Sequence, residues 1–484
     1  MTVRVRIAPS PTGDPHVGTA YMALFNLAFA RQQGGSFVLR VEDTDRARFQ
    51  ADSERQLYDT LAWLGLDWDE GPDKGGPFAP YRQSERLDTY RPYVDQLLAQ
   101  GNAYHCWCTP ARLQEMREDQ QRRKVPTGYD RLCLGKTYEE RVALGGSQET
   151  PVVRMRIPED PPLSFTDLIR GEVNAPHPDD QVILKGDGFP TYHLAVVVDD
   201  HLMGITHVVR GEEWISSTPK HLLLFDWLGW ERPVFAHMPL LRNTDKSKIS
   251  KRKNPAARLT WFAEQGYLPE ALRNFLGLLG YSLPDGQEVF SFDEMVATFD
   301  WERVNTVGPV FDLDKLGWLN GHYVRELAPA DLADRLEPFL RDAGLYTGTP
   351  EQRALLDGAV PLVQTRMALL SEVVDLLRFL FVAEADFAVD PAAADKALGP
   401  DAAPVLTACA DALEGLGEWT TEAVQAAMDA ALLEGLGLKR GKAYAPVRVA
   451  VCGASVAPPL PESMALLGKD RVLARLRSAP GTAL

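Results

Sequence analysis

Apolar positions near the N-terminus change from an alternating pattern to a helical one. Residues 3–7 alternate like a short half-buried strand, and apolar residues then recur at helical spacing from 17 to about 33. Residues 36–41 predict a second strand, and residues 53–64 predict a second helix. Alternating strands and helices predict an α/β domain with a doubly wound sheet, in which ligands bind outside the carboxyl ends of the strands.

The strand pattern resumes after a long segment of different character. Residues 181–184, 191–200 and 206–209 predict strands, and the continuous apolar run at 191–200 is typical of a central strand buried on both faces. A helix is predicted to begin at residues 217–219. We therefore expect residues 87–186 to form an α+β insertion into the doubly wound domain.

The C-terminal part of the chain is predicted to be all-α. Helical patterns cover residues 326–345, residues 351–380 with an interruption near Pro361, and residues 420–433. This part contains no cluster of residues typical of catalysis, so we expect it to be a binding region.

Length and composition limit the possible functions. A chain of 484 residues exceeds a single core and predicts three or more domains. Five unevenly spaced cysteines, no apolar run of ~18 residues and no signal-peptide core predict a cytoplasmic protein without membrane segments. A net charge of -16 makes general nucleic-acid binding unfavourable, so RNA would have to bind local basic patches.

The first candidate site is the strand-to-helix turn at residues 9–19. Asp14 is a favourable N-cap, and Pro15 suits the first helical position, which would place His16 and Thr19 on one face of the first turn. A helix N-terminus attracts phosphate, and Gly18 would let a flat base lie close. The alternative is an ordinary turn with a surface histidine.

A second candidate is the basic segment at residues 246–253, which is unusual in so acidic a chain. Lys248, Ser250 and Lys251 could hold the phosphates of a nucleotide, and such electrostatic stabilisation is usually the largest catalytic contribution. The alternative is a solvated basic loop.

Three cysteines and a tyrosine lie within the predicted insertion. Cys106 and Cys108 are followed by Tyr129 and Cys133, a set that could hold a tetrahedral zinc ion with an unusual tyrosine ligand. The alternative is a group of free thiols in a reduced protein.

The two candidate sites together resemble the two signatures of the class I aminoacyl-tRNA synthetases. His16-Val-Gly-Thr19 resembles the first, and Lys248-Ile-Ser-Lys-Arg252 resembles the second. Flanking segments at 6–13, 40–45, 190–201 and 210–214 resemble bacterial glutamyl-tRNA synthetases, and the similarity extends over essentially the whole chain.

This resemblance implies a domain order and a reaction. A Rossmann-type catalytic domain would comprise 1–86 and 187–228, with an acceptor-stem-binding insertion at 87–186. A stem-contact domain with the lysine loop would follow at 229–326, and helical anticodon-binding subdomains would occupy 327–378 and 379–484. ATP with Mg²⁺ would activate L-glutamate to glutamyl-adenylate, and the glutamyl group would pass to the 3′ end of tRNA(Glu). The enzyme would act as a monomer.

The resemblance also assigns roles to individual residues. Catalytic residues would be His16, Thr19, Lys248, Ser250 and Lys251, and Gly18, Glu213, Trp214 and Ile249 would complete the ATP site. Thr19 stands where the general signature has a second histidine, so it adds no charge. The glutamate site would comprise Arg6, Ala8, Ser10, Glu42, Tyr192 and Arg210, with both arginines facing carboxylates. Structural salt bridges are the alternative for the arginines.

Specificity for tRNA is assigned to two arginines. Arg366 aligns with a position that reads the third anticodon base, which would favour discrimination against tRNA(Gln), and Arg448 is a second candidate. A helix-surface arginine is the alternative for Arg366. Competing functions are a glutaminyl-tRNA synthetase, a truncated enzyme that glutamylates a modified tRNA base, an inactive tRNA-binding paralogue and a small-molecule nucleotidyltransferase. The long helical C-terminal region argues against the truncated enzyme and the nucleotidyltransferase.

Overall fold

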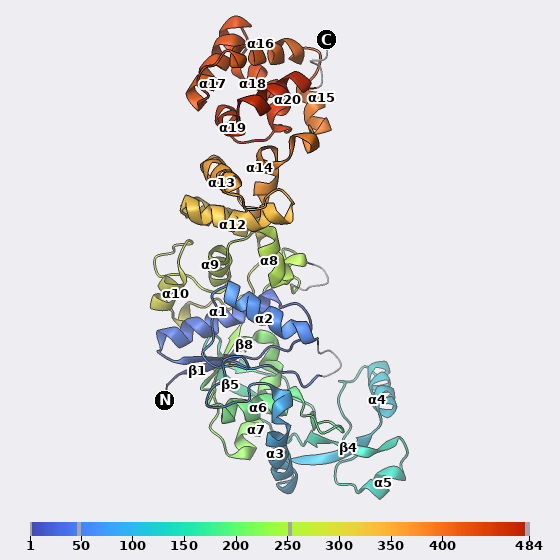
Figure 1. Ribbon diagram of the computed structural model, residues 1–484. Helices are drawn as coiled ribbons and strands as arrows, with labels where there is room; N and C mark the ends of the chain where they lie inside the picture. Colours follow the sequence, from blue (N-terminus) through green and yellow to red (C-terminus); the bar gives the residue numbers. More distant parts are fainter. Residues whose placement is uncertain (1, 46–49, 250–253, 480–484) are drawn as a thin grey trace. The chain divides into compact units, whose positions relative to one another are not determined.

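The computed structural model describes residues 2–45, 50–249 and 254–479 (Figure 1). The chain forms two compact units, Met1–Phe262 with Leu272–Leu313, and Ala263–Ala271 with Asp314–Leu484. In the described residues we find no helix with the length and apolar character that a membrane span requires.

Parallel strands form the centre of the first unit. Strand β1 (Arg4–Ile7) pairs with β2 (Ser36–Leu39), and β8 (His207–Gly211) pairs with β9 (Val234–Met238), which pairs in turn with β5 (Ser164–Asp167). The antiparallel edge strand is β6 (Gly171–Asn174). The Thr206 N–H donates to the Arg4 carbonyl at 3.0 Å, so β1 and β8 adjoin and end at the same edge.

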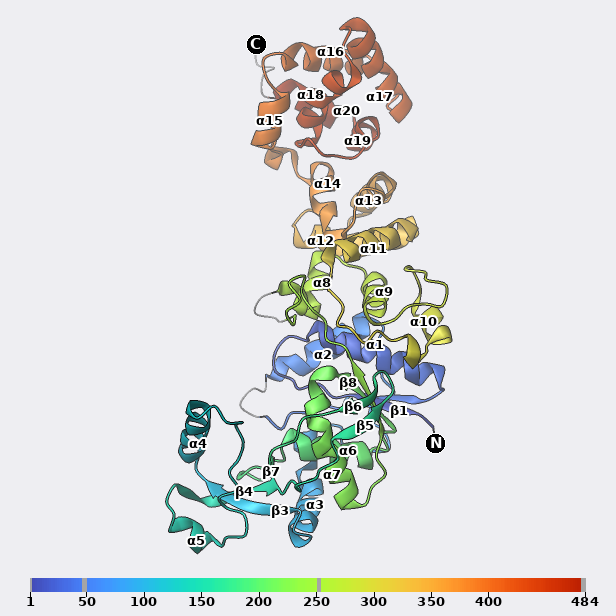
Figure 2. The same ribbon diagram turned by 180° about the vertical axis from the view of Figure 1, so that it is seen from behind.

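Helices cover both sides of these strands, as the prediction of a doubly wound domain requires. Figures 1 and 2 show α1 (Val17–Gln32) and α2 (Ala51–Trp63) on one side, and α6 (Tyr192–Leu202) and α7 (Thr218–Leu228) on the other. Helices α8 (Leu259–Gln265), α9 (Pro269–Gly280) and α10 (Phe292–Thr298) follow β9 in the chain.

The prediction of a central strand at residues 191–200 is wrong, because this segment forms helix α6. Every residue from Leu194 to Asp200 is buried, so the apolar run has no polar face that would reveal its helical period. A short run that is apolar on all sides fits a buried strand and a buried helix equally well.

The segment between β2 and β8 contains a separate antiparallel sheet, while β5 and β6 of the same segment join the sheet of β9 and β8. The strands of the separate sheet, β3 (Ala103–Cys108), β4 (Ser147–Met155) and β7 (Val182–Leu184), are accompanied by helices α3 (Leu87–Ala99), α4 (Pro110–Arg122) and α5 (Tyr138–Val142). An α+β insertion is thus present. Residues 181–184 form the predicted strand, and as β7 it pairs with β4 of this antiparallel sheet and not with the parallel strands.

The second unit is helical throughout its described residues. Its helices are α11 (Leu313–Glu326), α12 (Pro329–Asp342), α13 (Pro350–Val363), α14 (Val373–Phe381), α15 (Pro391–Ala397), α16 (Ala402–Glu414), α17 (Thr421–Met428), α18 (Arg440–Cys452), α19 (Leu460–Leu467) and α20 (Lys469–Ser478). The interruption expected near Pro361 is present, although α13 continues through the proline itself: it ends at Val363, and α14 begins at Val373.

Candidate active site

A cavity of about 600 Å³ lies at the carboxyl ends of β1 and β8. Its lining includes every described residue that the sequence placed in the ATP and glutamate sites: Arg6, Ala8, Ser10, His16, Gly18, Thr19, Glu42, Tyr192, Arg210, Glu213, Trp214, Lys248 and Ile249. The fold thus brings β1 close to Lys248 and Ile249, which belong to the basic segment at residues 246–253. The remaining predicted residues, Ser250 and Lys251, lie outside the described part of the chain.

The turn before α1 has a different cap from the expected one. Helix α1 begins at Val17, and His16 is its N-cap, with Nδ1 accepting from the Gly18 N–H at 2.9 Å. A Cβ at Gly18 would lie 3.1 Å from this Nδ1, so the glycine makes room for the histidine cap. Asp14 is not the cap, and its carboxylate pairs with Arg258 at 3.4 Å.

The nucleotide side of the cavity combines an aromatic wall with an ion pair. Tyr192 and Trp214 pack with ring centroids 4.3 Å apart. The Lys248 ammonium lies 3.3 Å from the Glu213 carboxylate, and both side chains are partly exposed. The Trp214 side of this wall could receive a base, while Tyr192 belongs to the predicted glutamate site. The lysine could exchange its carboxylate partner for a phosphate.

The first predicted arginine of the glutamate site is paired with an acid. Nε and Nη2 of Arg6 donate to the two oxygens of Asp200 at 3.0 and 3.2 Å. Arg40 donates to the same carboxylate at 2.8 Å. Burial alone would raise the pKa of Asp200, but the two arginines hold it below its usual value. Arg6 is therefore part of a buried ion-pair network, which was the structural alternative, while it also lines the cavity.

Arg210 has a different environment, because its described partners are uncharged. Its Nε donates to His237 at 3.0 Å, Nη1 to His221 at 3.1 Å, and Nη2 to the Thr218 hydroxyl at 2.9 Å. Burial lowers the pKa of Arg210. A buried guanidinium without an ion-pair partner among the described residues is well suited to bind an anionic ligand.

Glu42 is the carboxylate available for an ammonium group. It is 6% exposed, and it accepts from Arg40 at 3.1 Å. Burial raises the pKa of Glu42 to about 7, even though Arg40 and Arg6 act in the opposite direction. An ammonium group bound beside it would favour the charged form.

Three residues of this site were not predicted from the sequence. Asp200 holds Arg6, while His221 and His237 hold Arg210. Asp200 ends the buried run of α6, where a charged residue could have been noticed. The two histidines carry no signal of this kind: His221 follows Lys220 at the start of a helix, and His237 is a single histidine in an otherwise apolar strand.

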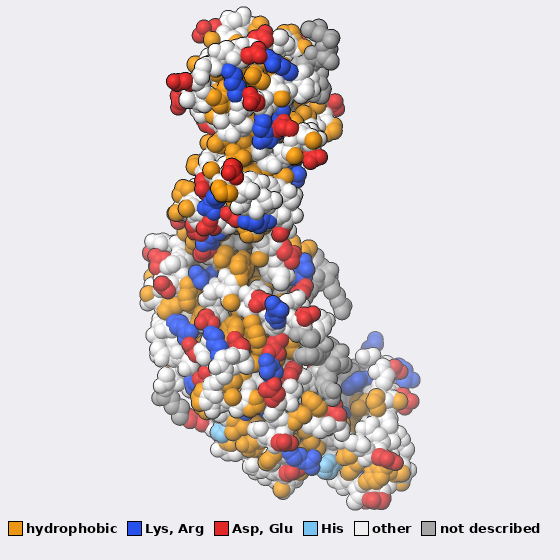
Figure 3. Space-filling model, viewed as in Figure 1, with side chains coloured by type: hydrophobic (Ala, Val, Ile, Leu, Met, Phe, Trp, Pro, Cys, Tyr) orange, Lys and Arg blue, Asp and Glu red, His pale blue; other side chains and the backbone are white. Residues whose placement is uncertain are grey.

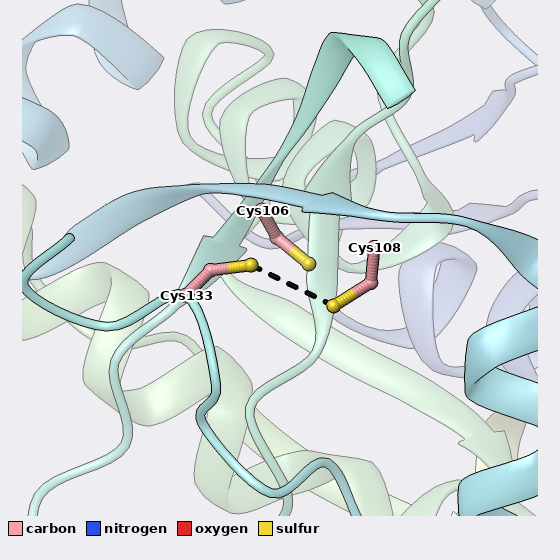
Figure 4. A group of neighbouring side chains, drawn as sticks. All are labelled: Cys106, Cys108 and Cys133. Atoms are coloured by element: carbon pink, nitrogen blue, oxygen red, sulfur yellow. Dashed lines mark hydrogen bonds between the residues drawn. The ribbon is translucent and has the colours of Figure 1, made fainter. Parts of the chain in front are cut away.

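The predicted cysteine cluster forms in the insertion. Figure 4 shows Cys106, Cys108 and Cys133 pointing toward one another, and their sulfur atoms all lie within 4.8 Å. The Tyr129 hydroxyl lies 3.4 Å from Cys106 and from Cys108. Three soft donors and a phenol oxygen therefore converge, and this donor set fits a zinc ion. The nearby guanidinium groups of Arg112 and Arg141 could offset thiolate charge.

The two arginines predicted to contact the anticodon differ in exposure. Arg366 is exposed in the turn directly after α13, so it is not a helix-surface residue. Arg448 is half-buried on α18, and its Nε is a buried atom without a hydrogen-bond partner among the described residues. On the face drawn in Figure 3, acidic and basic side chains are interspersed. Any RNA-binding surface on that face is therefore local.

The parallel sheet, the cavity at its edge and the helical second unit agree with a class I tRNA synthetase, and the family model shows this class. The family model described as the catalytic domain of class I tRNA synthetases (E and Q) matches residues 2–318, and an anticodon binding domain matches residues 331–480. The chain belongs to the glutamate–tRNA ligase family within this class.

Relatives and solved structures support this assignment over the full chain. A glutamate–tRNA ligase from Acidothermus cellulolyticus is 72% identical, covering 100% of this chain and 96% of that protein. One from Cutibacterium acnes is 59% identical, with coverage of 98% and 97%. The crystal structure of a glutamate tRNA ligase from Elizabethkingia meningosepticum in complex with its amino acid covers 100% of both chains, with 33% identity and a TM-score of 0.84.

Proposed function

We propose that this chain joins L-glutamate to the 3′ end of tRNA(Glu) in two steps. Glutamate first attacks the α-phosphate of ATP, which yields glutamyl-adenylate and pyrophosphate, and the terminal adenosine of the tRNA then accepts the glutamyl group and releases AMP. The observation that carries the proposal is a single cavity that joins a helix N-terminus, a lysine and two buried arginines. Membership in the ligase family supports the same reaction.

Each part of the cavity has a task in this reaction. His16, Thr19 and the N-terminus of α1 would hold phosphate oxygens, while Gly18 and Trp214 would seat the adenosine. Lys248, with Ser250 and Lys251 of the same segment, would stabilise the leaving pyrophosphate, and Mg²⁺ would accompany ATP. Catalysis then depends on positioning and charge stabilisation, and it needs no nucleophilic side chain.

The amino-acid side of the cavity selects glutamate by charge. Glu42 would bind the substrate ammonium, and Arg6 and Arg210 would face its two carboxylates, with Ala8, Ser10 and Tyr192 completing the walls. Glutamine would present an amide to a buried guanidinium and would lose the ion pair. Sites of this kind can discriminate by about 10⁴.

The test is ATP–pyrophosphate exchange with glutamate, measured with and without purified tRNA(Glu) and tRNA(Gln). We expect exchange with glutamate and tRNA(Glu), and little exchange without tRNA. Exchange with tRNA(Gln) as well would retain the ligase and contradict the proposed discrimination. An absence of exchange under all conditions would favour a tRNA-binding paralogue without activity.

Arg366 is proposed to reject tRNA(Gln) by reading the third anticodon base, with Arg448 as a second contact. The exposed position of Arg366 after α13 supports this role. We expect Arg366→Gln to raise glutamylation of tRNA(Gln) about tenfold relative to tRNA(Glu), the usual effect of one lost base contact. Arg341→Gln, an exposed arginine on α12 with a Glu337 partner, is the control. Unchanged selectivity would mean that another residue reads this base.

Zinc is proposed at Cys106, Cys108, Tyr129 and Cys133, where it would stabilise the insertion. We expect about one zinc per chain by elemental analysis, and a lower melting temperature after chelation, because a structural zinc contributes folding energy. Cys133→Ser should lose the metal, whereas Cys452→Ala, a buried cysteine of the helical unit, should retain it. If chelation leaves the melting temperature of the wild-type protein unchanged, a zinc site at these residues is contradicted.

The wider organisation of the protein is proposed on the same basis. Residues 87–186 would bind the acceptor stem, residues 229–326 would contact the tRNA stem, and residues 327–378 and 379–484 would bind the anticodon. We propose a cytoplasmic enzyme, because tRNA and ATP are its proposed substrates. We propose a monomer, which sedimentation of the purified protein would test.

A further inference from the structure

The guanidinium of Arg210 is surrounded by neutral acceptors. His237 accepts from Nε, His221 and the Tyr192 hydroxyl accept from Nη1, and the Thr218 hydroxyl and the Trp214 carbonyl accept from Nη2. The residue is 6% exposed. Its hydrogen-bonding capacity is thus met by the protein, whereas its charge has no ion-pair partner among the described residues.

The hydrogen bonds fix both histidines in their neutral forms. Nδ1 of His237 donates to Asp167 at 2.7 Å, which leaves Nε2 to accept from Arg210. Nε2 of His221 meets Nδ1 of His193 at 3.1 Å, which leaves Nδ1 of His221 to accept from Arg210. Burial lowers the pKa of His237 to about 4 and that of His221 well below its usual value. Both histidines therefore act as acceptors at neutral pH.

Asp167 reaches this arrangement through His237 and does not bind Arg210 directly. Asp167 on β5 also accepts the backbone N–H groups of Ile169, Arg170 and His237 at 2.9–3.1 Å, so these groups solvate its charge. Arg6 shows the opposite arrangement, because two of its nitrogens bind the Asp200 carboxylate. Only one of the two arginines in the cavity is therefore neutralised by direct contact with an acid among the described residues.

We propose that His221 and His237 are specificity-determining positioning residues, which orient Arg210 through neutral acceptors and leave its positive charge for a substrate carboxylate. This inference rests on the proposed function and names the residues that set its amino-acid selectivity. The two longest bonds of Arg210, both 3.4 Å, reach Tyr192 and the Trp214 carbonyl at the cavity wall. A carboxylate could replace these bonds, whereas an amide would leave the charge unmatched.

The test compares two substitutions of similar shape at His221. His221→Asn keeps a neutral acceptor near the original Nδ1, and His221→Asp places a carboxylate there. We expect His221→Asp to lower the glutamate-over-glutamine ratio of kcat/KM in tRNA-dependent pyrophosphate exchange about 100-fold relative to His221→Asn, because a protein carboxylate would repel the substrate. The change should fall mainly on the KM for glutamate. Equal ratios in the two variants would overturn the proposal.

Thermal melting gives an independent measurement. A carboxylate beside an uncompensated guanidinium should stabilise the fold, so we expect His221→Asp to melt above His221→Asn. His237 offers no such pair, because its Nδ1 donates to Asp167 and a carboxylate at this position would meet that acid. A His221→Asp variant that melts below His221→Asn or fails to fold would overturn the proposal. Wild-type exchange with glutamate is measured in parallel, so failure of the proposed reaction is distinguished from failure of this inference.

Discussion

Replacement of Arg210 by glutamine should lower kcat/KM for glutamate about 1,000-fold, because loss of one partner from a buried charge pair costs about 4 kcal/mol. The expected loss lies mainly in the KM for glutamate, while the KM for ATP should change less, since Arg210 meets the proposed ATP site only at the Trp214 backbone carbonyl among its described hydrogen bonds. Pyrophosphate exchange at varied glutamate and fixed tRNA(Glu) measures both constants.

The same substitution should leave the melting temperature unchanged or raise it. Arg210 is buried, and its described partners are neutral, so its charge costs free energy in the folded protein without substrate. Arg6→Gln is the matched control. It leaves one buried oxygen of Asp200 without its Arg6 donor and should lower the melting temperature. Equal destabilisation by both substitutions would show that Arg210 has a structural role, which is the alternative to substrate binding.

The location of the site could be predicted from the sequence because strand ends define it. Arg6 and Arg210 belong to strands, and Glu42 follows one, so the rule for parallel sheets places all three at one edge. The prediction that Tyr192 lies in the site did not come from the rule for strand ends. The run that carries it is a helix, and its place in the cavity lining was expected only from the family resemblance.

The charge balance of the site could not be predicted from the sequence. Both arginines appeared equivalent, yet Asp200 neutralises Arg6 from 194 residues away in the chain, and His237 holds Arg210 without neutralising it. Such pairings depend on tertiary packing, which a local pattern does not encode. The prediction of Asp14 as the N-cap of α1 is wrong for a related reason. Asp14 pairs with the distant Arg258, and His16 caps the helix instead.

Replacement of Lys251 by alanine should lower kcat for pyrophosphate exchange about 10²–10³-fold, the usual loss when a preorganised charge-stabilising group is removed. Lys251 lies outside the described residues, but Lys248 and Ile249 of the same segment line the cavity beside His16. The side chain would act on charge that develops as pyrophosphate leaves. We therefore expect the KM for glutamate to change little, in contrast to the effect of Arg210→Gln.

The control for Lys251 is Lys253→Ala, which removes an equal charge from the same basic segment outside its signature. If the basic loop attracts polyphosphate only in a general way, the two substitutions should lower kcat by similar amounts. Both losses should then become smaller as the salt concentration is raised. If Lys251 contacts the leaving pyrophosphate specifically, only Lys251→Ala should lower kcat. This loss should be nearly independent of salt concentration. Near-normal turnover of Lys251→Ala would remove this lysine from the mechanism and leave Lys248 as the described cation at the phosphate side of the cavity.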